Sequence, residues 1–226
     1  MDAAWTQLAD ERLDLIRLLA PPFDGAGVDP GYIAAYPPGI RENGAQYTHA
    51  ACWMLYALAE LGEETRAHRA LRMLLPLNHA LDAVAAETYR VEPYVMAADV
   101  YTDALHAGRG GWSWYTGSAA WMLMALLRLL GFERSGNRVR LNALLGDWEE
   151  ASVTLRYGQS RYRLSCRRDA QGVRLDGAPV EGRFIGMIDD GLAHSPVFPP
   201  RALREAEAAR PRKMCIRDSP STGADA

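Results

Sequence analysis

The segment Thr116–Leu141, TGSAAWMLMALLRLLGFERSGNRVRL, contains the change of pattern that decides the fold. Its first part is apolar at nearly every position up to Gly131, which is typical of a buried helix that ends at a glycine. Beyond the glycine the apolar residues Val139 and Leu141 alternate with polar ones, and this two-residue period indicates a strand. The sequence therefore predicts a helical part followed by a β part, with a boundary near residues 132–137.

Helical spacing recurs upstream of this segment. Apolar residues separated by three and four positions predict helices over residues 3–19, 47–61 and 63–75. Pro21, Gly62 and Pro76 follow these stretches, and each is a residue type that ends a helix.

The part after the boundary predicts a small antiparallel sheet. Residues 153–157 and 162–166 alternate apolar with polar side chains, and the turn residues Gly158-Gln159 lie between them. Asp176-Gly177 indicates a second turn, and the many arginines at alternate positions indicate a solvated face. We therefore assign residues 1–134 to a helical domain, 135–198 to a β-domain and 199–226 to an irregular tail.

The tail has two different parts. Residues 201–209 are compatible with a short helix, whereas residues 210–226 have no apolar period. The string KMCIRDS at 213–219 resembles translated sequencing-adapter sequence, so we interpret residues 210–226 as non-native.

Composition excludes several classes of protein. The 226 residues carry a formal net charge of −3, which argues against a nucleic-acid partner. Acids within the first twenty residues argue against a signal peptide, and the strongly apolar run 119–127 is shorter than the about 20 residues of a membrane span. The separated Cys52, Cys166 and Cys215, without close histidine pairs, predict neither a disulfide framework nor a metal site. A cytoplasmic location is expected.

Three segments concentrate aromatic and polar residues beyond what packing requires. They are YPPGIRENGAQYTH at 36–49, YRVEPY at 89–94 and GRGGWSWYTGS at 108–118. Each precedes a predicted helix, and loops that precede alternate helices of a helical array gather at one end. Rings in such loops can stack on sugars, and carboxylates can bind hydroxyl groups.

The residues in these loops admit two interpretations. Thr116-Gly117-Ser118 begins a helix, whose free backbone amides form a good phosphate site; alternatively, Thr116 or Ser118 only caps the helix, which spacing alone favours. His49 taken alone is more often structural. Glu42 and Glu92 are either acid/base or sugar-binding groups or surface carboxylates. Trp112 and Trp114 are either a sugar platform or, more commonly for such residues, part of the core.

Taken together, the three segments resemble glycoside hydrolase family 94. The resemblance is carried by YPPGIRENGAQYTHA at 36–50, VEPYV at 91–95 with AADVY at 97–101, and GRGGWSWYTGS at 108–118, in the family's order. Residues 1–190 are covered, and within the family they are most similar to the C-terminal phosphorylase region of cyclic β-1,2-glucan synthases. One departure is Ala45, where the family usually has a second glycine, so a methyl group would crowd the loop or oppose a positive φ.

The resemblance implies a mainly α fold: the C-terminal part of an (α/α)6 barrel followed by a small antiparallel β-domain. It implies inverting phosphorolysis, or the reverse synthesis, of a β-linked gluco-oligosaccharide, with inorganic phosphate as co-substrate and no cofactor. The implied phosphate-binding residues are His49, Thr116 and Gly117, and the implied sugar-binding residues are Tyr36, Arg41 and Glu42.

The resemblance also implies that the general acid is an aspartate upstream of this chain, so that this chain alone is inactive. The full-length relative would lie at the inner membrane. Two alternatives stay open: a non-catalytic carbohydrate-binding remnant, and an inverting glycoside hydrolase on the same barrel, which would need a base carboxylate across the site.

Overall fold

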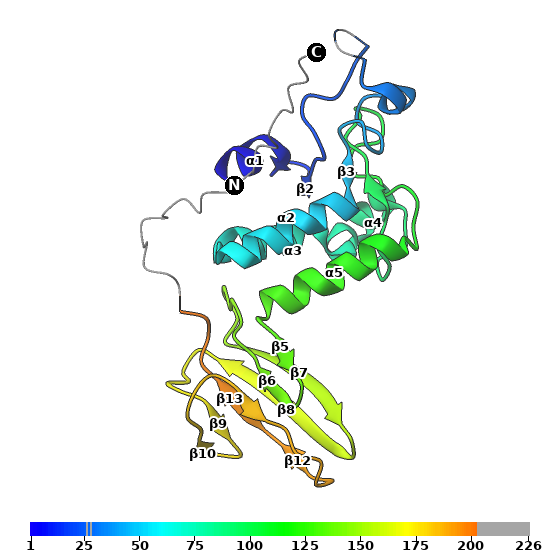
Figure 1. Ribbon diagram of the computed structural model, residues 1–226. Helices are drawn as coiled ribbons and strands as arrows, with labels where there is room; N and C mark the ends of the chain where they lie inside the picture. The colour runs from blue at the N-terminus through cyan, green and yellow to red at the C-terminus, as the bar shows by residue number, and fades with distance from the viewer. Residues whose placement is uncertain (26, 28, 203–226) are drawn as a thin grey trace, which may run out of the picture.

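The computed structural model describes residues 1–25, 27 and 29–202. Helices α2 (Thr48–Leu61) and α5 (Thr116–Leu129) lie side by side, and α3 (Glu64–Leu74) packs against α2 (Figure 1). The two long helices run in the same direction, because Glu60 near the end of α2 pairs with Arg128 near the end of α5. The predicted helices over 47–61, 63–75 and from Thr116 are thereby confirmed.

A single apolar cluster joins these three helices. Gly62 ends α2 in the left-handed conformation with φ 77°, where glycine carries no steric cost. The α3 residues Ala67, Ala70, Leu71 and Leu74 are buried against α2, with Leu55, Leu58 and Leu129 in the same cluster. The apolar residues of α3, spaced three and four apart, therefore form its buried face.

The N-terminal prediction of one helix over 3–19 is wrong. Helix α1 covers only Asp2–Leu8 and is followed by a hairpin of β1 (Ala9–Asp10) and β2 (Leu15–Ile16). The Asp10 carboxylate accepts the backbone amides of Arg12 and Leu13, which stabilises a turn in place of a helix. The Ile16 amide then donates to the buried Gln46 side chain, so tertiary contacts override the local apolar period.

Short elements connect the helices on the side of the α2 and α5 N-termini. They are η1 (Gly31–Ala35), β3 (Gln46–Tyr47), η2 (Pro76–Ala80), α4 (Ala83–Tyr89) and β4 (Asp99–Val100). Strands β3 and β4 pair with each other, which links the segment that precedes α2 to the segment between α4 and α5.

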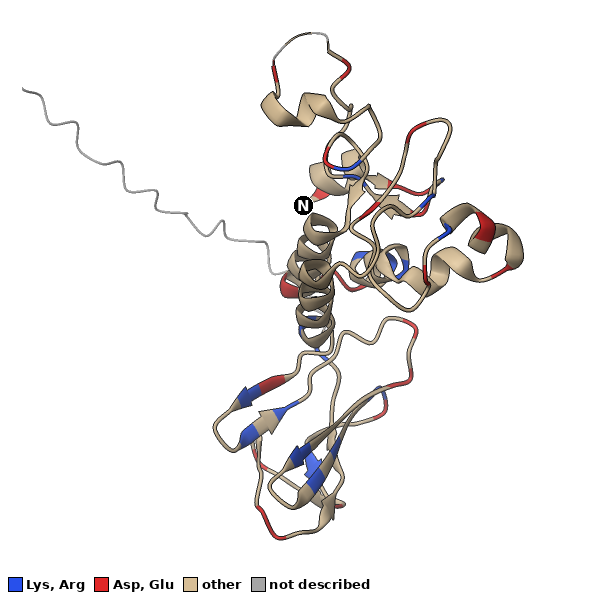
Figure 2. Ribbon diagram, turned by 90° about the vertical axis from the view of Figure 1, so that its right-hand side faces the viewer, with Lys and Arg blue, Asp and Glu red and all other residues tan. Residues whose placement is uncertain are grey.

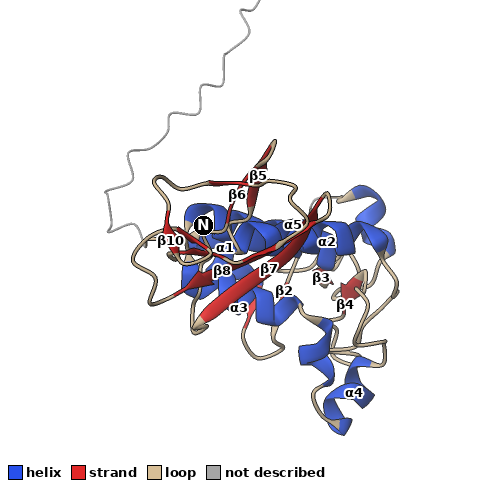
Figure 3. Ribbon diagram, turned by 90° about the horizontal axis from the view of Figure 1, so that it is seen from below, coloured by secondary structure: helices blue, strands red, loops and turns tan. Residues whose placement is uncertain are grey.

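The β part follows α5 in the chain, and Figure 3 shows its strands in red beside the helices in blue. A three-stranded sheet contains β5 (Glu133–Ser135), β6 (Arg138–Arg140) and β11 (Ile185–Gly186). A six-stranded sheet contains β7 (Glu150–Tyr157), β8 (Ser160–Arg167), β9 (Arg174–Leu175), β10 (Ala178–Pro179), β12 (Ala193–His194) and β13 (Pro196–Phe198). The predicted turns at 158–159 and 176–177 are confirmed, since they join β7 to β8 and β9 to β10.

The larger sheet is mixed, so the prediction of a purely antiparallel domain is wrong. Strands β12 and β13 both run parallel to β8, with His194 opposite Tyr162 and Phe198 opposite Cys166. Parallel neighbours require a crossover of about a dozen residues or more. The chain between β8 and β12, residues 168–192, is long enough for this return, and the period-two pattern carries no information on strand direction.

The arginine-rich face of the sheet is confirmed. On β8, Arg161, Arg163 and Arg167 are exposed, whereas Tyr162, Leu164 and Cys166 are fully buried. Figure 2 shows basic residues along the strands of this part of the molecule. The alternation separates a solvated face from a second apolar cluster.

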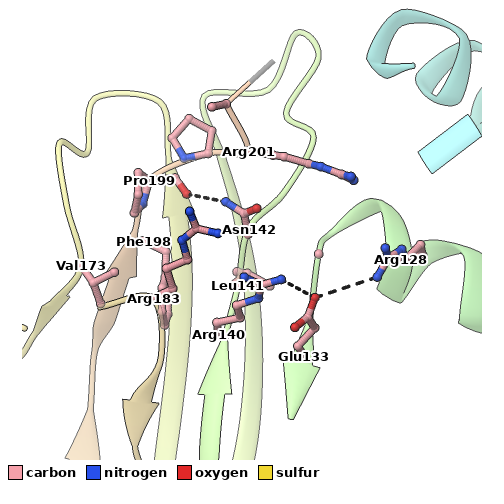
Figure 4. Close-up of a pocket in the computed structure, with 13 residues that line it drawn as sticks. Arg128, Glu133, Arg140, Leu141, Asn142, Val173, Arg183, Phe198, Pro199 and Arg201 are labelled. Atoms are coloured by element: carbon pink, nitrogen blue, oxygen red, sulfur yellow. Dashed lines mark hydrogen bonds and ion pairs between the residues drawn. The ribbon is translucent and has the colours of Figure 1, made fainter. Parts of the chain in front are cut away.

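Several contacts fix the β part against the helices. His68 on α3 bonds to the Leu144 carbonyl oxygen at 2.9 Å, and the Gly146 amide donates to Glu64 at 2.8 Å. A cavity of about 600 Å³ remains at this junction, lined in part by Arg128, Glu133, Arg140, Arg183 and Arg201 (Figure 4). The domain limits at 134 and 198 stay predictions.

The proposed helix over 201–209 and the non-native interpretation of 210–226 fall almost wholly outside the described residues. Within the described residues, no helix is long and apolar enough to span a membrane.

Candidate functional site

The three loop segments meet at the N-terminal ends of α2 and α5. The Thr48 amide donates to the Ala98 carbonyl at 2.9 Å, the Ala98 amide donates to Trp112 at 2.5 Å, and the Tyr115 amide donates to Met96 at 3.0 Å. These backbone bonds form a ladder across segments far apart in the sequence. The expected gathering of loops at one end is therefore confirmed, and we call this assembly the loop cluster, residues 36–49, 89–101 and 108–118.

His49 lies against the first turn of α5. A Cβ atom built on Gly117 would lie 3.5 Å from His49 Nδ1, so the imidazole is adjacent to the helix N-terminus. The ring contacts Tyr47, Trp53 and Trp121, with centroid distances of 6.4, 5.1 and 6.1 Å. Among the described residues neither ring nitrogen has a hydrogen-bond partner, so both stay available to a ligand.

The N-terminus of α5 is not capped by a side chain. Its cap residue is Tyr115, which makes no side-chain cap bond, and the Ser118 hydroxyl donates to the Tyr115 carbonyl instead of accepting an amide. Thr116 is exposed. The structure thus does not support the alternative in which Thr116 or Ser118 merely caps the helix, and the first-turn amides keep their partial positive charge.

Arg41 lies between two aromatic rings on the other part of the loop cluster. Its guanidinium carbon is 5.7 Å from the Tyr36 ring centroid and 6.0 Å from that of Trp112. Its Nε is 3.5 Å from a Glu42 carboxylate oxygen. The structure therefore brings Tyr36, Arg41 and Glu42 together, with an amphipathic surface of rings and charges that suits a sugar.

Asn43 fixes the loop that carries these residues. It is 1% exposed, and its Nδ2 donates to the carbonyl oxygens of Phe23 and Tyr36 at 2.9 and 2.8 Å. Gly44 adopts the positive φ of 91°, whereas Ala45 does not and is fully buried. The methyl group of Ala45 is accommodated, because the left-handed position falls on the glycine that this chain retains.

Asp99 is a residue that the sequence prediction missed. Its side chain is fully buried, and its Oδ1 lies 4.0 Å from Arg41 Nη1. Burial raises the pKa of Asp99, while the Arg41 guanidinium and nearby backbone amides oppose this shift. An acid inside the otherwise apolar string AADV was the available signal, since an acid there is either buried or functional.

A tyrosine pair is a second feature that sequence reasoning missed. The hydroxyl groups of Tyr47 and Tyr115 lie 3.0 Å apart. This hydrogen bond and burial raise the pKa of Tyr47 to about 12. The pair joins the residue before α2 to the residue before α5 and so holds His49 beside Gly117.

Trp112 and Trp114 are exposed, by 71% and 64%, so the core interpretation of these residues is wrong. The indole nitrogen of Trp114 donates to Glu92 at 3.1 Å. Hydrogen bonds from the Glu92 backbone amide, Ser113 and Trp114 lower the pKa of Glu92. A carboxylate held ionised in this way is suited to accept hydrogen bonds and not to act as a general acid.

The described residues contain no group of three or more side chains that could hold a metal ion. The arrangement of the loop cluster can instead bind an anion at the α5 N-terminus and a polyhydroxylated ring near Arg41. Both places belong to the same loop cluster.

Comparison with known proteins agrees with this geometry. Residues 1–131 match the family model described as the glycosyl hydrolase 94 superfamily, catalytic domain. The chain is 46% identical over 182 residues to the cyclic beta-(1,2)-glucan synthase NdvB of Rhizobium meliloti, which covers 80% of this chain and 6% of that protein.

Two phosphorylases are more distant relatives. Solabiose phosphorylase of Paenibacillus borealis is 29% identical over 186 residues, or 78% of this chain and 24% of that protein. N,N'-diacetylchitobiose phosphorylase of Vibrio proteolyticus is 26% identical over 179 residues, or 75% of this chain and 22% of that protein. The chain therefore spans about a quarter or less of the length of these relatives.

Proposed function

Because the chain belongs to the glycosyl hydrolase 94 superfamily, we propose that the loop cluster is part of a site for glycosyl transfer between a β-linked gluco-oligosaccharide and inorganic phosphate. The observation that carries this proposal is the placement of His49 against the uncapped first turn of α5. An imidazole and free backbone amides at one point make an anion site. The sugar-facing group of Tyr36, Arg41 and Glu42 belongs to the same loop cluster.

Phosphate chemistry explains why these residues suffice for one half of the reaction. An inverting hydrolase needs a general acid and a base that activates water. Phosphate is already a nucleophile, so a phosphorylase needs donors that hold the phosphate and one general acid that protonates the departing oxygen. In the proposal, His49 and the amides at Thr116 and Gly117 hold phosphate, while the acid is supplied by an aspartate outside this chain.

The sugar is the less specific half of the proposal. Tyr36 offers a ring, and Arg41 and Glu42 offer a donor and an acceptor to hydroxyl groups of the leaving sugar. A β-1,2-linked glucan is the proposed substrate, supported by the 46% identity to a protein named as a cyclic beta-(1,2)-glucan synthase. Synthesis and phosphorolysis use the same groups in reverse, so the proposal covers both directions.

The proposal also places this chain within a larger (α/α)6 barrel. Helices α2 and α5 are apolar on most sides, yet Trp53, Leu123 and Met124 are 51%, 58% and 49% exposed. A helix that is apolar all round is normally buried, and exposed apolar patches mark interaction surfaces. Further helices of the barrel would cover this face and bring the general acid to the site.

Binding of inorganic phosphate tests the proposal directly. We expect the 226-residue chain to bind phosphate in calorimetry, and His49→Ala to weaken this binding by about tenfold or more, because a bond to a charged group contributes about 1.5–3 kcal/mol. His106→Ala is the matched control, since His106 pairs with Asp103 outside the proposed anion site. Equal phosphate affinity of His49→Ala and wild type would refute the site.

Sugar binding with and without phosphate separates the proposal from its two alternatives. A chain that binds β-1,2-gluco-oligosaccharides but never phosphate would be a non-catalytic carbohydrate-binding protein. A hydrolase on the same barrel would gain nothing from phosphate, so phosphate would neither assist nor compete with its sugar. We expect phosphate to change the apparent affinity for the oligosaccharide, because the two ligands meet between His49 and Glu42.

A further inference from the structure

Tyr94, Trp114 and Glu92 form a surface that the proposed function does not use, and we call it the aromatic shelf. The Tyr94 and Trp114 side chains are 76% and 64% exposed, with ring centroids 6.2 Å apart and an interplanar angle of 77°. Large exposed rings are poorly explained by packing, because they leave apolar area in water. Two such rings in contact form a platform and not an isolated exposed side chain.

The Trp114 ring is held in place although it is exposed. Its indole nitrogen donates to Glu92 Oε1 at 3.1 Å, and its backbone has a φ of 59°, a region that bulky residues rarely adopt. The next residue, Tyr115, is anchored by its amide bond to Met96. A strained residue persists only where its surroundings fix it, and such residues gather at ligand sites.

The aromatic shelf is continuous with the proposed phosphate site. A cavity of about 410 Å³ has Tyr94, Trp114, Tyr115 and Thr116 in its wall. Its remaining wall is largely apolar and includes Leu75, Leu77 and Met96. A ligand that extends from the α5 N-terminus therefore meets the Trp114 ring next, without leaving the protein surface.

We propose that the aromatic shelf is an additional sugar subsite, which binds a pyranose unit of an oligosaccharide beyond the units at the reaction centre. A pyranose has an apolar C–H face and a rim of hydroxyl groups. The Trp114 and Tyr94 rings match the face, and the Glu92 carboxylate keeps acceptor capacity beyond its bond to the indole. This inference rests on the proposed function, because it requires an oligosaccharide at the loop cluster.

The subsite predicts a dependence on chain length. A disaccharide fills only the positions around Glu42, whereas a longer glucan also reaches Trp114. The longer glucan should therefore bind more tightly, and only its affinity should depend on the shelf residues. Binding in this subsite also positions the glucan at the loop cluster. Trp114 takes no part in the chemical step.

Titration of the full chain with β-1,2-linked glucobiose and glucopentaose tests the inference. We expect Trp114→Ala and Tyr94→Ala to weaken pentaose binding by about tenfold in calorimetry and to leave biose binding unchanged. Tyr32→Ala is the matched control, because the Tyr32 side chain is also 71% exposed but lies in η1. Circular dichroism verifies that each variant is folded, and the two shelf variants test the same subsite independently.

Indole nitrogen–proton NMR signals distinguish the possible failures. Trp114→Tyr identifies the Trp114 signal, which should shift with pentaose and not with biose. If the Trp112 signal shifts while Trp114 is silent, or if both glucans bind equally in wild type and shelf variants, the subsite is refuted and the proposed function stands. If no indole signal shifts and neither glucan binds, both are refuted.

Discussion

At the scale of single residues, Asp99 is a buried acid whose charge opposes the stability of the folded chain. Its carboxylate is fully buried beside Arg41, and burial raises its pKa. A raised folded-state pKa means that ionisation destabilises the folded chain, so stability falls as the pH rises above about 4. The Asp99 carboxylate nevertheless faces the Arg41 guanidinium, which lies between the Tyr36 and Trp112 rings.

We therefore predict that Asp99→Asn stabilises the chain at neutral pH but weakens oligosaccharide binding. The amide removes the buried charge and also the attraction that orients Arg41. Urea unfolding at pH 7 should show a higher midpoint, and calorimetry should show several-fold weaker binding of glucopentaose. Asp103→Asn, which alters an acid outside the Arg41 contact, serves as the control. Unchanged sugar affinity in Asp99→Asn would show that Asp99 does not position Arg41.

His194 gives a pH dependence to the β part. Its ring nitrogens bond to Asp176 at 2.7 Å and Asp190 at 3.0 Å, and its ring stacks on Tyr162. The two carboxylates raise the pKa of His194, and Asp190 has its pKa lowered to about 2. The histidine therefore contributes stability below about pH 6.5, which is lost as the pH rises through its folded-state pKa.

The expected result is lower stability at pH 8 than at pH 6, with this difference reduced in His194→Asn. The difference is measured as the change in urea midpoint between pH 6 and pH 8, with unfolding monitored by the circular dichroism of the β-sheet. His106→Asn is the control, because His106 is half exposed and pairs with one aspartate. A wild-type midpoint that does not change between pH 6 and 8 would contradict the assigned role of His194.

The sequence identified the residues that carry recognisable chemistry, and it missed those defined by burial. His49, Thr116, Gly117 and Glu42 were selected through the family resemblance of their motifs, whereas their types and spacing alone left a structural role open. Asp99 and the Tyr47–Tyr115 pair depend on which loop packs on which, and a single sequence does not encode that pairing visibly. The roles of Asp99 and of the Tyr47–Tyr115 pair stay predictions.

At the scale of elements, the loop 36–49 depends on one side chain. Asn43 bonds to both Phe23 and Tyr36, and its own oxygen accepts the Phe23 amide at 2.7 Å. We predict that Asn43→Ala lowers the free energy of unfolding by about 2–4 kcal/mol, since each buried bond contributes about 0.5–1.5 kcal/mol. Asn78→Ala removes one exposed bond and is the control. Equal urea midpoints for the two variants would refute this anchoring role.

Elements were predictable where one physical signal was dominant. Helix α3 has a strong apolar period, helices α2 and α5 are apolar at most positions, and glycine or proline follows each of the three, so the predicted limits agree with the structure. The stretch 3–19 has the same period, but the Asp10 turn and the Gln46 contact of Ile16 decide its structure. The direction of β12 and β13 is likewise set by the course of residues 168–192. The alternation of apolar and polar residues within a strand does not indicate this direction.

At the scale of the whole molecule, the order of a helical part and a β part follows from the sequence, whereas the completeness of the site does not. In the proposed site, the loop cluster supplies donors for phosphate and groups for a sugar, and its acids do not serve as the proton donor, because Asp99 is buried, Glu42 faces Arg41, and Glu92 is held ionised. In the proposed barrel, the general acid would lie on further helices that cover the exposed faces of α2 and α5.

Because the general acid is proposed to lie outside this chain, we predict that the isolated chain binds its ligands but does not catalyse the reaction. The 226-residue chain should bind phosphate and β-1,2-gluco-oligosaccharides yet release no glucose 1-phosphate from them, because the leaving oxygen has no donor, and general acid catalysis contributes about 10²–10⁴-fold in rate. A chain extended at its N-terminus by the rest of the proposed barrel should turn over, and His49→Ala in that longer protein should abolish phosphorolysis. The assay is phosphate-dependent release of glucose 1-phosphate, with the longer protein as positive control. Turnover by the short chain would place the acid within it, and Glu42 and Glu92 would then be the first residues to replace with glutamine.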